Sequence, residues 1–282
     1  MPGTLYVVAT PIGNLEDVTL RALRILRDVS VIAAEDTRRT SRLLQHYSIS
    51  TPTTSLHEHN ETARTPGLIQ RLLSGESVAV VSDAGTPVVS DPGARLVAAA
   101  HEAGVRVEPI PGPSAALAAV SASGLGGDGF LFVGFPPSKA GQRREWLSRL
   151  AAEKRPVVLY EAPHRIRATL EDMLAVMGDR TMAVGRELTK AHEELVIRPI
   201  SGHLAVMTDV RGELTLVVAP DSRPLAHPER PSADSLRVEF GRLTERAGVT
   251  RREAIRSLAE KYGLKAREVY ALVEEGRRLT RP

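Results

Sequence analysis

The sequence predicts an α/β protein with two α/β domains and a small helical domain at the end. Three observations lead to this prediction. Short apolar runs alternate with helical patterns through residue 110, which is the order of a parallel sheet with right-handed crossovers. More closely spaced strand patterns follow residue 129 and predict a second, mixed sheet. Near the end, two helical patterns flank a short turn, as in a helix-turn-helix.

The composition is typical of a soluble globular protein. Of the 282 residues, 42% are hydrophobic and 25% are charged, which is enough to bury a sizeable core in each of two domains. The absence of cysteine excludes disulfides and thiolate metal sites. Neither a secretory signal nor an apolar run of membrane-spanning length is readable. We therefore expect a cytoplasmic protein without a membrane partner.

The first domain is predicted over residues 1–113. Its strands are expected at residues 4–9, 31–34, 53–56, 78–81 and 105–110, and its helices at residues 19–29, around 43–44, 68–73 and 94–103. The run at 78–81 is short and β-branched, as in a strand buried on both faces of a parallel sheet. The turn at residues 10–15 is neither a dinucleotide-binding G-x-G-x-x-G nor a Walker loop.

The connection over residues 82–93 is unusually long. It takes twelve residues where a strand-to-helix loop usually takes about two to six. Two Gly and two Pro permit sharp turns and bare backbone, while Asp83 and Asp91 add charge beside exposed N–H groups. Such a loop at the carboxyl end of a buried strand is where α/β proteins bind small ligands. An ordinary surface turn is the alternative.

The second domain is predicted over residues 114–220. Its strands are expected near residues 130–133, 156–160, 182–184, 194–197 and 213–218, and its helices around 142–152, 165–177 and 202–206. The Ala- and Ser-rich residues 115–123 and the glycine-rich residues 124–129 are interpreted as the passage into this domain. Pro220, Pro224, Pro228 and Pro231 then mark residues 221–231 as a linker.

Residues 232–282 are predicted to form the helix-turn-helix domain. Residues 250–253 read as a capping box, in which hydroxyl and carboxylate each satisfy a free backbone N–H. The helix that follows ends at Gly263 and turns one apolar face inward, formed by Ala254, Ile255, Leu258, Ala259 and Tyr262. A second helix starts near Ala266, and its inward residues are Val269, Tyr270 and Val273.

The basic excess is concentrated at the end of the chain. Residues 221–282 hold fourteen Arg or Lys against ten Asp or Glu, a net +4, whereas residues 1–220 sum to −1. A basic appendage on a near-neutral body favours a polyanionic partner such as nucleic acid. Solvated helix faces and a plain protein-packing module are alternatives with the same charge count.

Eight polar or glycine-rich motifs follow one another along the chain. They occupy residues 10–15, 35–38, 57–61, 82–87, 90–93, 111–115, 160–165 and 186–190. In this order they resemble the ribosomal RNA small subunit methyltransferase I (RsmI) family, within the tetrapyrrole methylase superfamily. The resemblance covers residues 5–218, and the helix-turn-helix tail fits it. One such motif would be unspecific, but eight in order are a strong signal.

The resemblance implies two α/β domains of the tetrapyrrole-methylase (class III methyltransferase) type. It also implies a homodimeric, S-adenosyl-L-methionine-dependent enzyme that methylates the ribose 2′-hydroxyl of a decoding-region cytidine in 16S rRNA. The substrate would be small-subunit ribosomal RNA or the assembled small ribosomal subunit. The cofactor would lie folded between the two α/β domains. Carried over by motif, its contacts would be Ile12, Gly85, Thr86, Pro87, Val89, Ser114, Ala115, Tyr160, Glu161, Ala162, Glu213 and Leu214.

The sequence departs from the family's pattern at two positions. Val88 stands where Gly usually follows Gly-Thr-Pro, and Pro136 stands where Leu commonly precedes the Pro at 137. Both departures concern the local backbone beside the expected ligand, so they bear on the details of ligand contact.

A ribose hydroxyl is a poor nucleophile and benefits from a general base or a nearby cation. Three polar clusters, at residues 35–38, 57–61 and 186–190, are available for that work. Within them, Lys190 is a candidate base if burial lowers its pKa, and Asp36 is a second catalytic candidate. Helix caps and loop hydrogen bonds explain such clusters as readily. Candidates for holding RNA phosphates are Arg38, Arg186, Arg251, Arg252, Lys265 and Arg267.

Three other interpretations compete with this one. His57 and His59 form a His-x-His pattern beside Glu58, but no third ligand follows at a diagnostic spacing, so no metal is expected. A tetrapyrrole or precorrin methylase of the same fold is disfavoured by the basic tail, although the loop motifs do not exclude it. A non-catalytic nucleic-acid-binding protein would leave the long loops unexplained.

Overall fold

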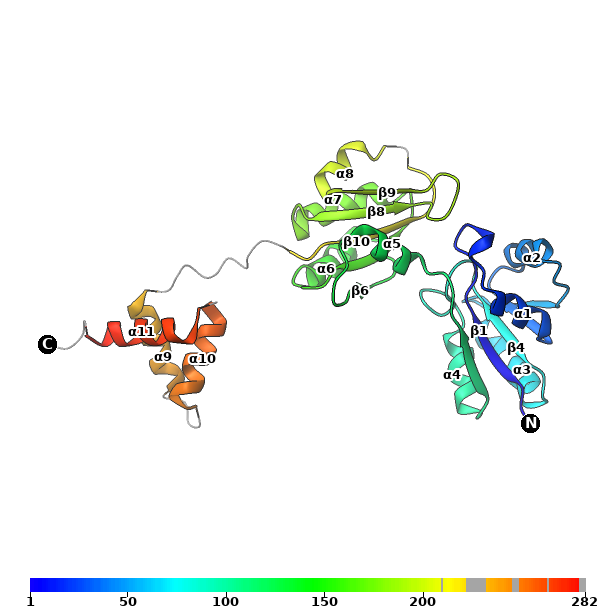
Figure 1. Cartoon of the computed structure of the whole chain (residues 1–282), viewed down its shortest axis with the longest axis horizontal. Helices are drawn as coiled ribbons and strands as arrows, with labels where there is room; N and C mark the ends of the chain where they lie inside the picture. The colour runs from blue at the N-terminus through cyan, green and yellow to red at the C-terminus, as the bar shows by residue number, and fades with distance from the viewer. Residues whose placement is uncertain (209, 222–231, 245–248, 263, 279–282) are drawn as a thin grey trace. The chain divides into compact units, whose positions relative to one another are not determined.

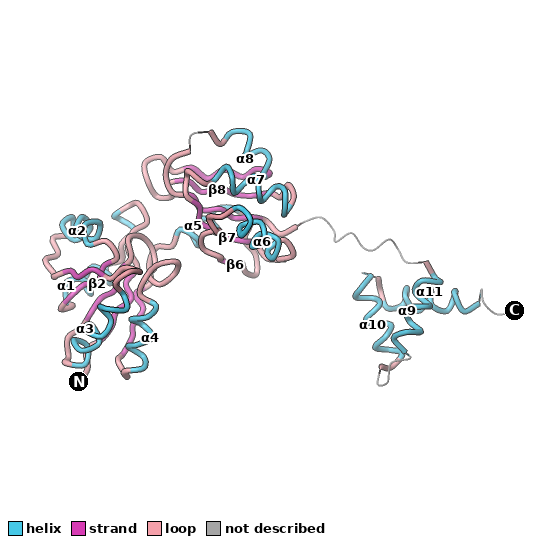
Figure 2. Tube along the Cα trace, turned by 180° about the vertical axis from the view of Figure 1, so that it is seen from behind, coloured by secondary structure: helices cyan, strands magenta, loops and turns pink. Residues whose placement is uncertain are grey.

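The computed structural model describes residues 1–208, 210–221, 232–244, 249–262 and 264–278. The chain divides into two compact units, unit 1 (Met1–Asp221) and unit 2 (Ser222–Pro282). Their elements are labelled in Figure 1 and coloured by type in Figure 2. Apart from Asp221, the predicted linker at 221–231 lies outside the described residues. Among the helices described, none combines the length and the apolar character needed to cross a bilayer.

The first sheet of unit 1 is parallel throughout, as predicted. Its strand order is β3-β2-β4-β1-β5, and every neighbouring pair runs in the same direction. The strands are β1 (Thr4–Val8), β2 (Val31–Ala34), β3 (Thr53–Ser55), β4 (Val78–Val81) and β5 (Arg106–Ile110). Every residue of β2 and β4 is buried, which is the pattern of strands covered on both faces.

Helices cover both faces of this sheet. The first turn contains the short 3-10 helix η1 (Leu15–Asp17), and the four α-helices are α1 (Leu20–Asp28), α2 (Thr37–His46), α3 (Glu61–Leu73) and α4 (Ala94–Glu102). Leu26 of α1 packs with Ile32 on one face. On the other face, Leu72 of α3 and Leu96 of α4 pack with Val80. The two cores hold the sheet rigid, so the loops at its carboxyl edge have fixed ends.

The second sheet of unit 1 is mixed, which confirms the prediction. Its strand order is β6-β7-β10-β8-β9. The strands are β6 (Leu131–Phe132), β7 (Val157–Glu161), β8 (Thr181–Arg186), β9 (Glu194–Pro199) and β10 (Leu214–Val218). β10 lies antiparallel to both β7 and β8. Consequently the start of β10 lies at the same edge of the sheet as the ends of β7 and β8.

Helices also cover both faces of the second sheet. One face packs against α6 (Ala140–Leu150), α7 (Ile166–Met177) and α8 (Ile200–Val206), through residues such as Leu147, Leu170 and Ile200. The other face packs against α5 (Ala115–Ser123).

Helix α5 corrects the interpretation of residues 115–123 as a passage between domains. Ala116 and Ala119 are buried against the second sheet. The Ser114 hydroxyl caps the start of the helix, and Gly124 ends it with a φ of +65°. Small apolar residues on nearly every side of a helix give no periodic pattern, which is why the sequence did not reveal it.

Unit 2 contains three helices in its described residues, α9 (Ala233–Thr244), α10 (Arg251–Tyr262) and α11 (Ala266–Arg278). The sequence predicted the last two and missed α9. The common core consists of Leu236, Phe240, Ala254, Leu258, Val269 and Val273. The capping box is confirmed, because Glu253 accepts the Thr250 N–H at 2.8 Å and the Thr250 hydroxyl accepts the Glu253 N–H at 3.3 Å.

Tyr270 was expected to point inward but is 54% exposed. Val269 and Val273, four residues apart, take the inward face of α11, and a helical step of about 100° turns Tyr270 away from it. Gly263, the predicted helix end, lies outside the described residues.

Candidate functional site

A cavity of about 330 Å³ lies in unit 1, where the carboxyl ends of the parallel strands meet one edge of the second sheet. The loops after β1, β2, β4 and β5 form one side of it. The other side comes from the segments after β6, β7 and β8 and from the start of β10. This volume falls in the usual range for small-ligand sites, and the edge is the one at which α/β sheets bind ligands.

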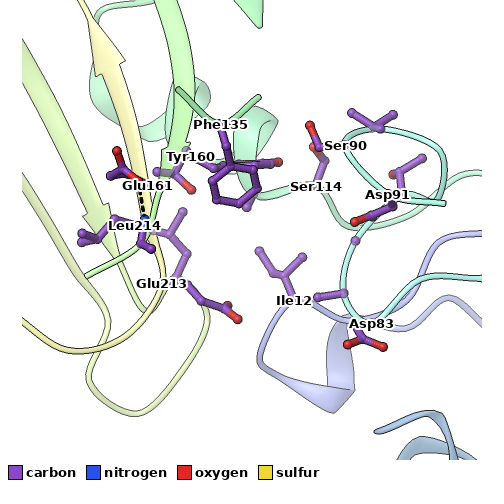
Figure 3. Close-up of a pocket in the computed structure, with 18 of the residues that line it drawn as sticks. Ile12, Asp83, Ser90, Asp91, Ser114, Phe135, Tyr160, Glu161, Glu213 and Leu214 are labelled. Atoms are coloured by element: carbon purple, nitrogen blue, oxygen red, sulfur yellow. Dashed lines mark hydrogen bonds between the residues drawn. The ribbon is translucent and has the colours of Figure 1, made fainter. Parts of the chain in front are cut away.

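Most of the residues expected to contact the cofactor line this cavity. Those in its walls are Ile12, Gly85, Thr86, Val89, Ser114, Ala115, Tyr160, Glu161, Ala162, Glu213 and Leu214. Pro87 is the exception: it is buried in the loop after β4 and does not line the cavity. Figure 3 shows Glu213 and Leu214 on one side of the cavity and Ile12 and Asp83 on the other.

The loop after β4 is held in place by the turn after β1. The backbone groups of Thr10 and Gly85 exchange two hydrogen bonds, of 2.9 and 3.0 Å. Gly85 has a φ of +80°, and a Cβ there would lie 3.4 Å from Ile12. Within the same loop, Val88 and Ser90 have φ values of +74° and +66°, which non-glycine residues rarely adopt. The loop therefore presents a strained, fixed backbone to the cavity.

The wall formed by the first sheet is acidic. Glu35, Asp83 and Asp91 all line the cavity, and Glu35 accepts the Asp83 N–H at 3.2 Å. Arg39 also lines the cavity and lies 3.4 Å from the Asp83 carboxylate. Carboxylates at a concave, half-buried surface favour a cationic ligand.

Two of these carboxyl groups have raised pKa values. Burial raises the pKa of Glu35, with a further contribution from the charge of Asp83. Burial also raises the pKa of Asp91 to about 6. The charges of Glu35 and Asp83 add to this increase, while a hydrogen bond with Ser82 opposes it. Asp91 is thus a carboxylate whose basicity is well above that of an exposed aspartate.

The wall formed by the second sheet is mainly aromatic and apolar. The rings of Phe135 and Tyr160 lie 5.5 Å apart (Figure 3), and Leu188 and Leu214 line the same side. Phe135 is 54% exposed, so much of its ring is open to a ligand. Burial raises the pKa of the Tyr160 hydroxyl.

Glu161 is buried in the same wall and already has hydrogen-bond partners. Its carboxylate accepts the Ala162 N–H at 2.8 Å and the Thr169 hydroxyl at 2.5 Å. It therefore shapes the end of β7 and is not available as a free base.

Lys190 does not line the cavity, and its environment does not favour the neutral amine. Its Nζ lies 2.9 Å from Glu187 and 3.0 Å from Glu213. Partial burial acts to lower the pKa of Lys190, but the hydrogen bonds and charges of the two glutamates outweigh it and raise the pKa. The condition on which Lys190 was a candidate base is therefore not met.

Asp36 also lies outside the cavity walls. It caps α2 by accepting the Arg38 N–H at 2.9 Å, and the Arg38 guanidinium binds both of its carboxylate oxygens. The side-chain hydrogen bond from Arg38 is the main reason that the pKa of Asp36 lies well below its usual range. Such a carboxylate is a weak base.

The other polar motifs are largely structural. Asn60 accepts the His57 N–H at 2.9 Å. Glu61 accepts the N–H groups of Gly93, Arg95 and Leu96 at 3.2, 2.8 and 3.3 Å, so it caps α4. In the part of the chain that the structure describes, no group of three or more metal-ligating side chains could hold a metal ion.

The six basic candidates for RNA contact are spread over both units. Arg186 binds Glu194 at 2.8 Å. Arg251 lies 3.5 Å from Glu274 and over the ring of Phe240. Arg38, Arg252, Lys265 and Arg267 are exposed on the surface.

Several lining residues were not on the list of expected cofactor contacts. Glu35, Asp83 and Asp91 lay within the quoted motifs, and their position directly after strands could have placed them in the site. Leu188 also lay within a quoted motif, at residues 186–190, whereas Arg39 and Phe135 lay outside the eight motifs. The residues added by the structure are Glu35, Arg39, Asp83, Ala84, Ser90, Asp91, Phe135, Pro163, Leu188 and Thr215.

Comparison with known families and sequences gives consistent results. Residues 4–202 match the model of the Tetrapyrrole (Corrin/Porphyrin) Methylases. A relative from Synechocystis sp. named Ribosomal RNA small subunit methyltransferase I is 47% identical, over 96% of this chain and 97% of its own length. A relative of the same name from Escherichia coli O157:H7 is 42% identical, over 97% of this chain and 96% of its own length.

Solved structures share the fold at low sequence identity. A cobalt precorrin-4 methyltransferase aligns with a TM-score of 0.60 and 17% identity, over 77% of this chain and 94% of its own. Uroporphyrin-III C-methyl transferase from Thermus thermophilus, in complex with S-adenosyl homocysteine, aligns with a TM-score of 0.57 and 20% identity, over 77% and 97%. These likenesses establish the architecture of unit 1.

Proposed function

Because the chain belongs to the ribosomal RNA small subunit methyltransferase I family of the tetrapyrrole (corrin/porphyrin) methylases, we propose that it methylates ribosomal RNA with S-adenosyl-L-methionine as donor. The target is the ribose 2′-hydroxyl of a decoding-region cytidine in 16S rRNA. The observation that carries the proposal is the 42–47% identity to relatives of that name over 96–97% of the chain, a span that takes in the cavity motifs and unit 2.

The cavity suits the donor's chemistry. When bound, the donor supplies an electrophilic methyl group on a sulfonium cation. The acidic wall of Glu35, Asp83 and Asp91 favours a cation. The aromatic and apolar wall of Phe135, Tyr160 and Leu214 suits an adenine ring, and the bare backbone near Gly85 suits an amino-acid end.

Positioning supplies much of the rate in such a reaction. Methyl transfer to a hydroxyl is an in-line displacement, and a rigid site holds the two reactants in line. The hydrogen bonds between Thr10 and Gly85, and the cores on both faces of the first sheet, keep the loop after β4 from moving. This fixed loop supports a role in aligning the reactants.

The basic residues support RNA as the substrate. Arg39 lies at the cavity with 59% of its side chain exposed, so it could hold a phosphate next to the reacting ribose. In unit 2, Arg252, Lys265 and Arg267 are exposed. Contacts between these side chains and phosphates would add sequence-independent affinity.

The proposal includes an oligomeric state and a cellular location. The protein acts as a homodimer, and its ribosomal substrate places it in the cytoplasm. Analytical ultracentrifugation of the full chain tests the first point: a single species of twice the chain mass is expected, and a monomer at micromolar concentration would contradict it.

The decisive experiment offers the enzyme a choice of acceptors. Purified protein and labelled S-adenosylmethionine are incubated with small ribosomal subunits, with naked 16S rRNA, or with a precorrin. Label is expected in the rRNA, at a cytidine whose 3′ linkage resists alkali, because a methylated 2′-oxygen cannot attack the neighbouring phosphate. Label in the precorrin alone would overturn the proposal.

Gly85→Val provides a matched inactive control. A larger side chain at a φ of +80°, with Ile12 already 3.4 Å from the Cβ position, should distort the loop that borders the cavity. Donor binding by calorimetry and methylation should both be lost, while circular dichroism stays unchanged.

A further inference from the structure

A second concave surface of unit 1 lies beside the cavity. It is an open groove of about 680 Å³ between the start of α7 and the segment that joins α8 to β10 (residues 207–208 and 210–212), and these elements are labelled in Figure 1. The groove borders the cavity at two points. Pro163 lines both of them, and Gly212 of the groove is followed directly by Glu213 of the cavity.

The less exposed residues of the groove are apolar. Pro163, Ile166, Met207 and Val210 all line it. Ile166 is buried in the core of the second sheet, and Met207 and Val210 pack against that core. The groove therefore has a fixed apolar floor, and its volume falls in the usual range for sites that bind small molecules.

The exposed residues of the groove carry its polar groups. His164 and Arg167 lie at the start of α7, and Thr208 and Arg211 lie on the facing segment. The two sides of the groove thus contribute one arginine each. Guanidinium groups bind phosphate through paired, charge-assisted hydrogen bonds. An apolar floor between two arginines matches a nucleotide, which combines a flat base with a charged phosphate.

Arg167 is held in position and still open to solvent. Its Nε atom lies 3.2 Å from Glu171, and its Nη1 atom donates to the Leu204 carbonyl at 3.4 Å. The side chain is nevertheless 59% exposed. An exposed ion pair of this kind contributes little to stability, so a phosphate can replace Glu171 as the partner of Arg167.

We propose that this groove holds the nucleotide next to the methylated cytidine, in the same strand of ribosomal RNA. The inference rests on the proposed function, in which the ribose of that cytidine reaches the cavity. Because the groove and the cavity share Pro163, consecutive nucleotides of one strand occupy them together. Arg167 and Arg211 bind the phosphate, and the apolar floor receives the base or ribose. Arg39 lies on the opposite wall of the cavity, so the strand has a cationic contact on each side of the reacting ribose.

The first test removes both arginines of the groove. Arg167→Ala with Arg211→Ala is compared with the wild type in steady-state methylation of small subunits. The KM for small subunits should rise by about tenfold or more. Both kcat and donor affinity by calorimetry should stay within about threefold, because the groove holds the acceptor equally before and during methyl transfer. The slope of log K against log salt for 16S rRNA binding should become shallower by about 1–2.

Arg149→Ala with Arg155→Ala is the matched control. Both arginines are exposed and paired with a nearby glutamate, and neither lines the groove or the cavity. This double variant loses the same charge as the first, and its KM should stay near that of the wild type. An equal rise in KM in the two double variants would assign the effect to general charge and overturn the proposal.

The second test locates the RNA directly. Since the chain contains no cysteine, Thr208→Cys at the exposed edge of the groove accepts a thiol-specific photo-crosslinker at one position only. The labelled protein is irradiated with small subunits, and the crosslinked nucleotides are mapped by primer extension. Crosslinks should fall on nucleotides that adjoin the methylated cytidine. Arg149→Cys, labelled in the same way, should give none there.

Three further results would count against the groove. They are an unchanged KM and salt slope in Arg167→Ala with Arg211→Ala, a loss confined to kcat or donor affinity, and crosslinks from position 208 only to ribosomal protein or to distant rRNA. Any of these would contradict the proposal while leaving the methylation of rRNA intact. A wild type that leaves rRNA unmethylated would instead overturn the proposed function, and the acceptor experiment above reveals that separately.

Discussion

Val88 has a φ of +74°, in a region where a β-branched side chain is strained by about 1–3 kcal/mol. The family's pattern usually has Gly at this position, and the backbone now explains that preference. Val88 also packs close to the neighbouring helix start, because a Cβ at Gly93 would lie 3.3 Å from its Cγ2 atom.

The strain at Val88 can be tested by comparing the stabilities of two variants. Val88→Gly and Val88→Ala both remove the isopropyl group, but only glycine relieves the left-handed backbone. Val88→Gly should therefore be the more stable of the two by about 1 kcal/mol, the reverse of the usual order of Ala and Gly within helices. Urea unfolding of the two variants measures the difference, and a more stable Ala variant would contradict the assigned conformation.

Asp91 should make the folded protein less stable at neutral pH. Its folded pKa of about 6 is higher than the unfolded value of 3.8, so the folded state binds the proton more tightly. The free energy of unfolding therefore falls as pH rises from about 4 to 6. Asp91→Asn should stabilise the protein at pH 7 by about 1 kcal/mol, a figure reduced for the solvent that still reaches the side chain.

Thermal or urea unfolding at several pH values measures this effect. The advantage of Asp91→Asn should vanish below about pH 4, where the wild-type carboxyl is protonated in both states. An advantage that is independent of pH would show that the gain has another origin.

The sequence could predict which loops form the site, but not which of their side chains pair with one another. Backbone loops that directly follow predicted strands were placed correctly at the cavity, because the ends of parallel strands share an edge. The pairing of Lys190 with Glu213 joins residues 23 positions apart and depends on the strand order of the second sheet. No local pattern reveals such a contact, and it reversed the expected pKa shift of Lys190.

At the scale of elements, α4 depends on a cap supplied by another helix. Its own N-cap residue, Gly93, has no side chain to offer, and Glu61 of α3 accepts three N–H groups there. A carboxylate at a helix N-terminus is stabilising through both hydrogen bonds and the helix dipole. The loop that borders the cavity ends where α4 begins, so the same cap also fixes the end of that loop.

Removing that cap should have a measurable cost. Glu61→Ala should destabilise the protein by about 1–2 kcal/mol in urea unfolding. Glu58→Ala is the matched control, because Glu58 is exposed and no hydrogen bond or ion pair involves it among the described residues. Equal stabilities for the two variants would show that the cap contributes nothing.

The elements differ in how well the sequence predicted them. The strands of both sheets were anticipated, most clearly β4 and β10, which are apolar runs buried over their whole length. Helix α3 begins at Glu61, earlier than residue 68, because the mostly polar residues 62–65 form its first turn. Helices α5 and α9 were missed. For α5, small apolar residues on most sides left no periodicity to detect.

At the scale of the whole molecule, unit 2 is the basic part of the chain. Its exposed Arg252 and Arg267 lie in the first turns of α10 and α11. If these residues bind phosphates, RNA affinity should depend on them and on salt, whereas donor affinity should not.

Two charge reversals in unit 2 test whether RNA affinity depends on these residues while donor affinity does not. Arg252→Glu with Arg267→Glu should weaken binding to small-subunit RNA and lower the slope of log K against log salt by about 2. Donor affinity by calorimetry should stay unchanged. Arg24→Glu with Arg42→Glu, at exposed sites of unit 1, is the control. Similar losses in both double variants would assign the effect to general charge.

The walls of the cavity come from the ends of both sheets in unit 1, and each sheet has hydrophobic cores of its own. A molecule bound in the cavity contacts both sheets. Neither sheet can therefore unfold unless that molecule first dissociates. Occupancy should therefore merge the melting of the two halves into one steeper transition. A cell starved of that molecule would hold a looser protein, more open to proteases.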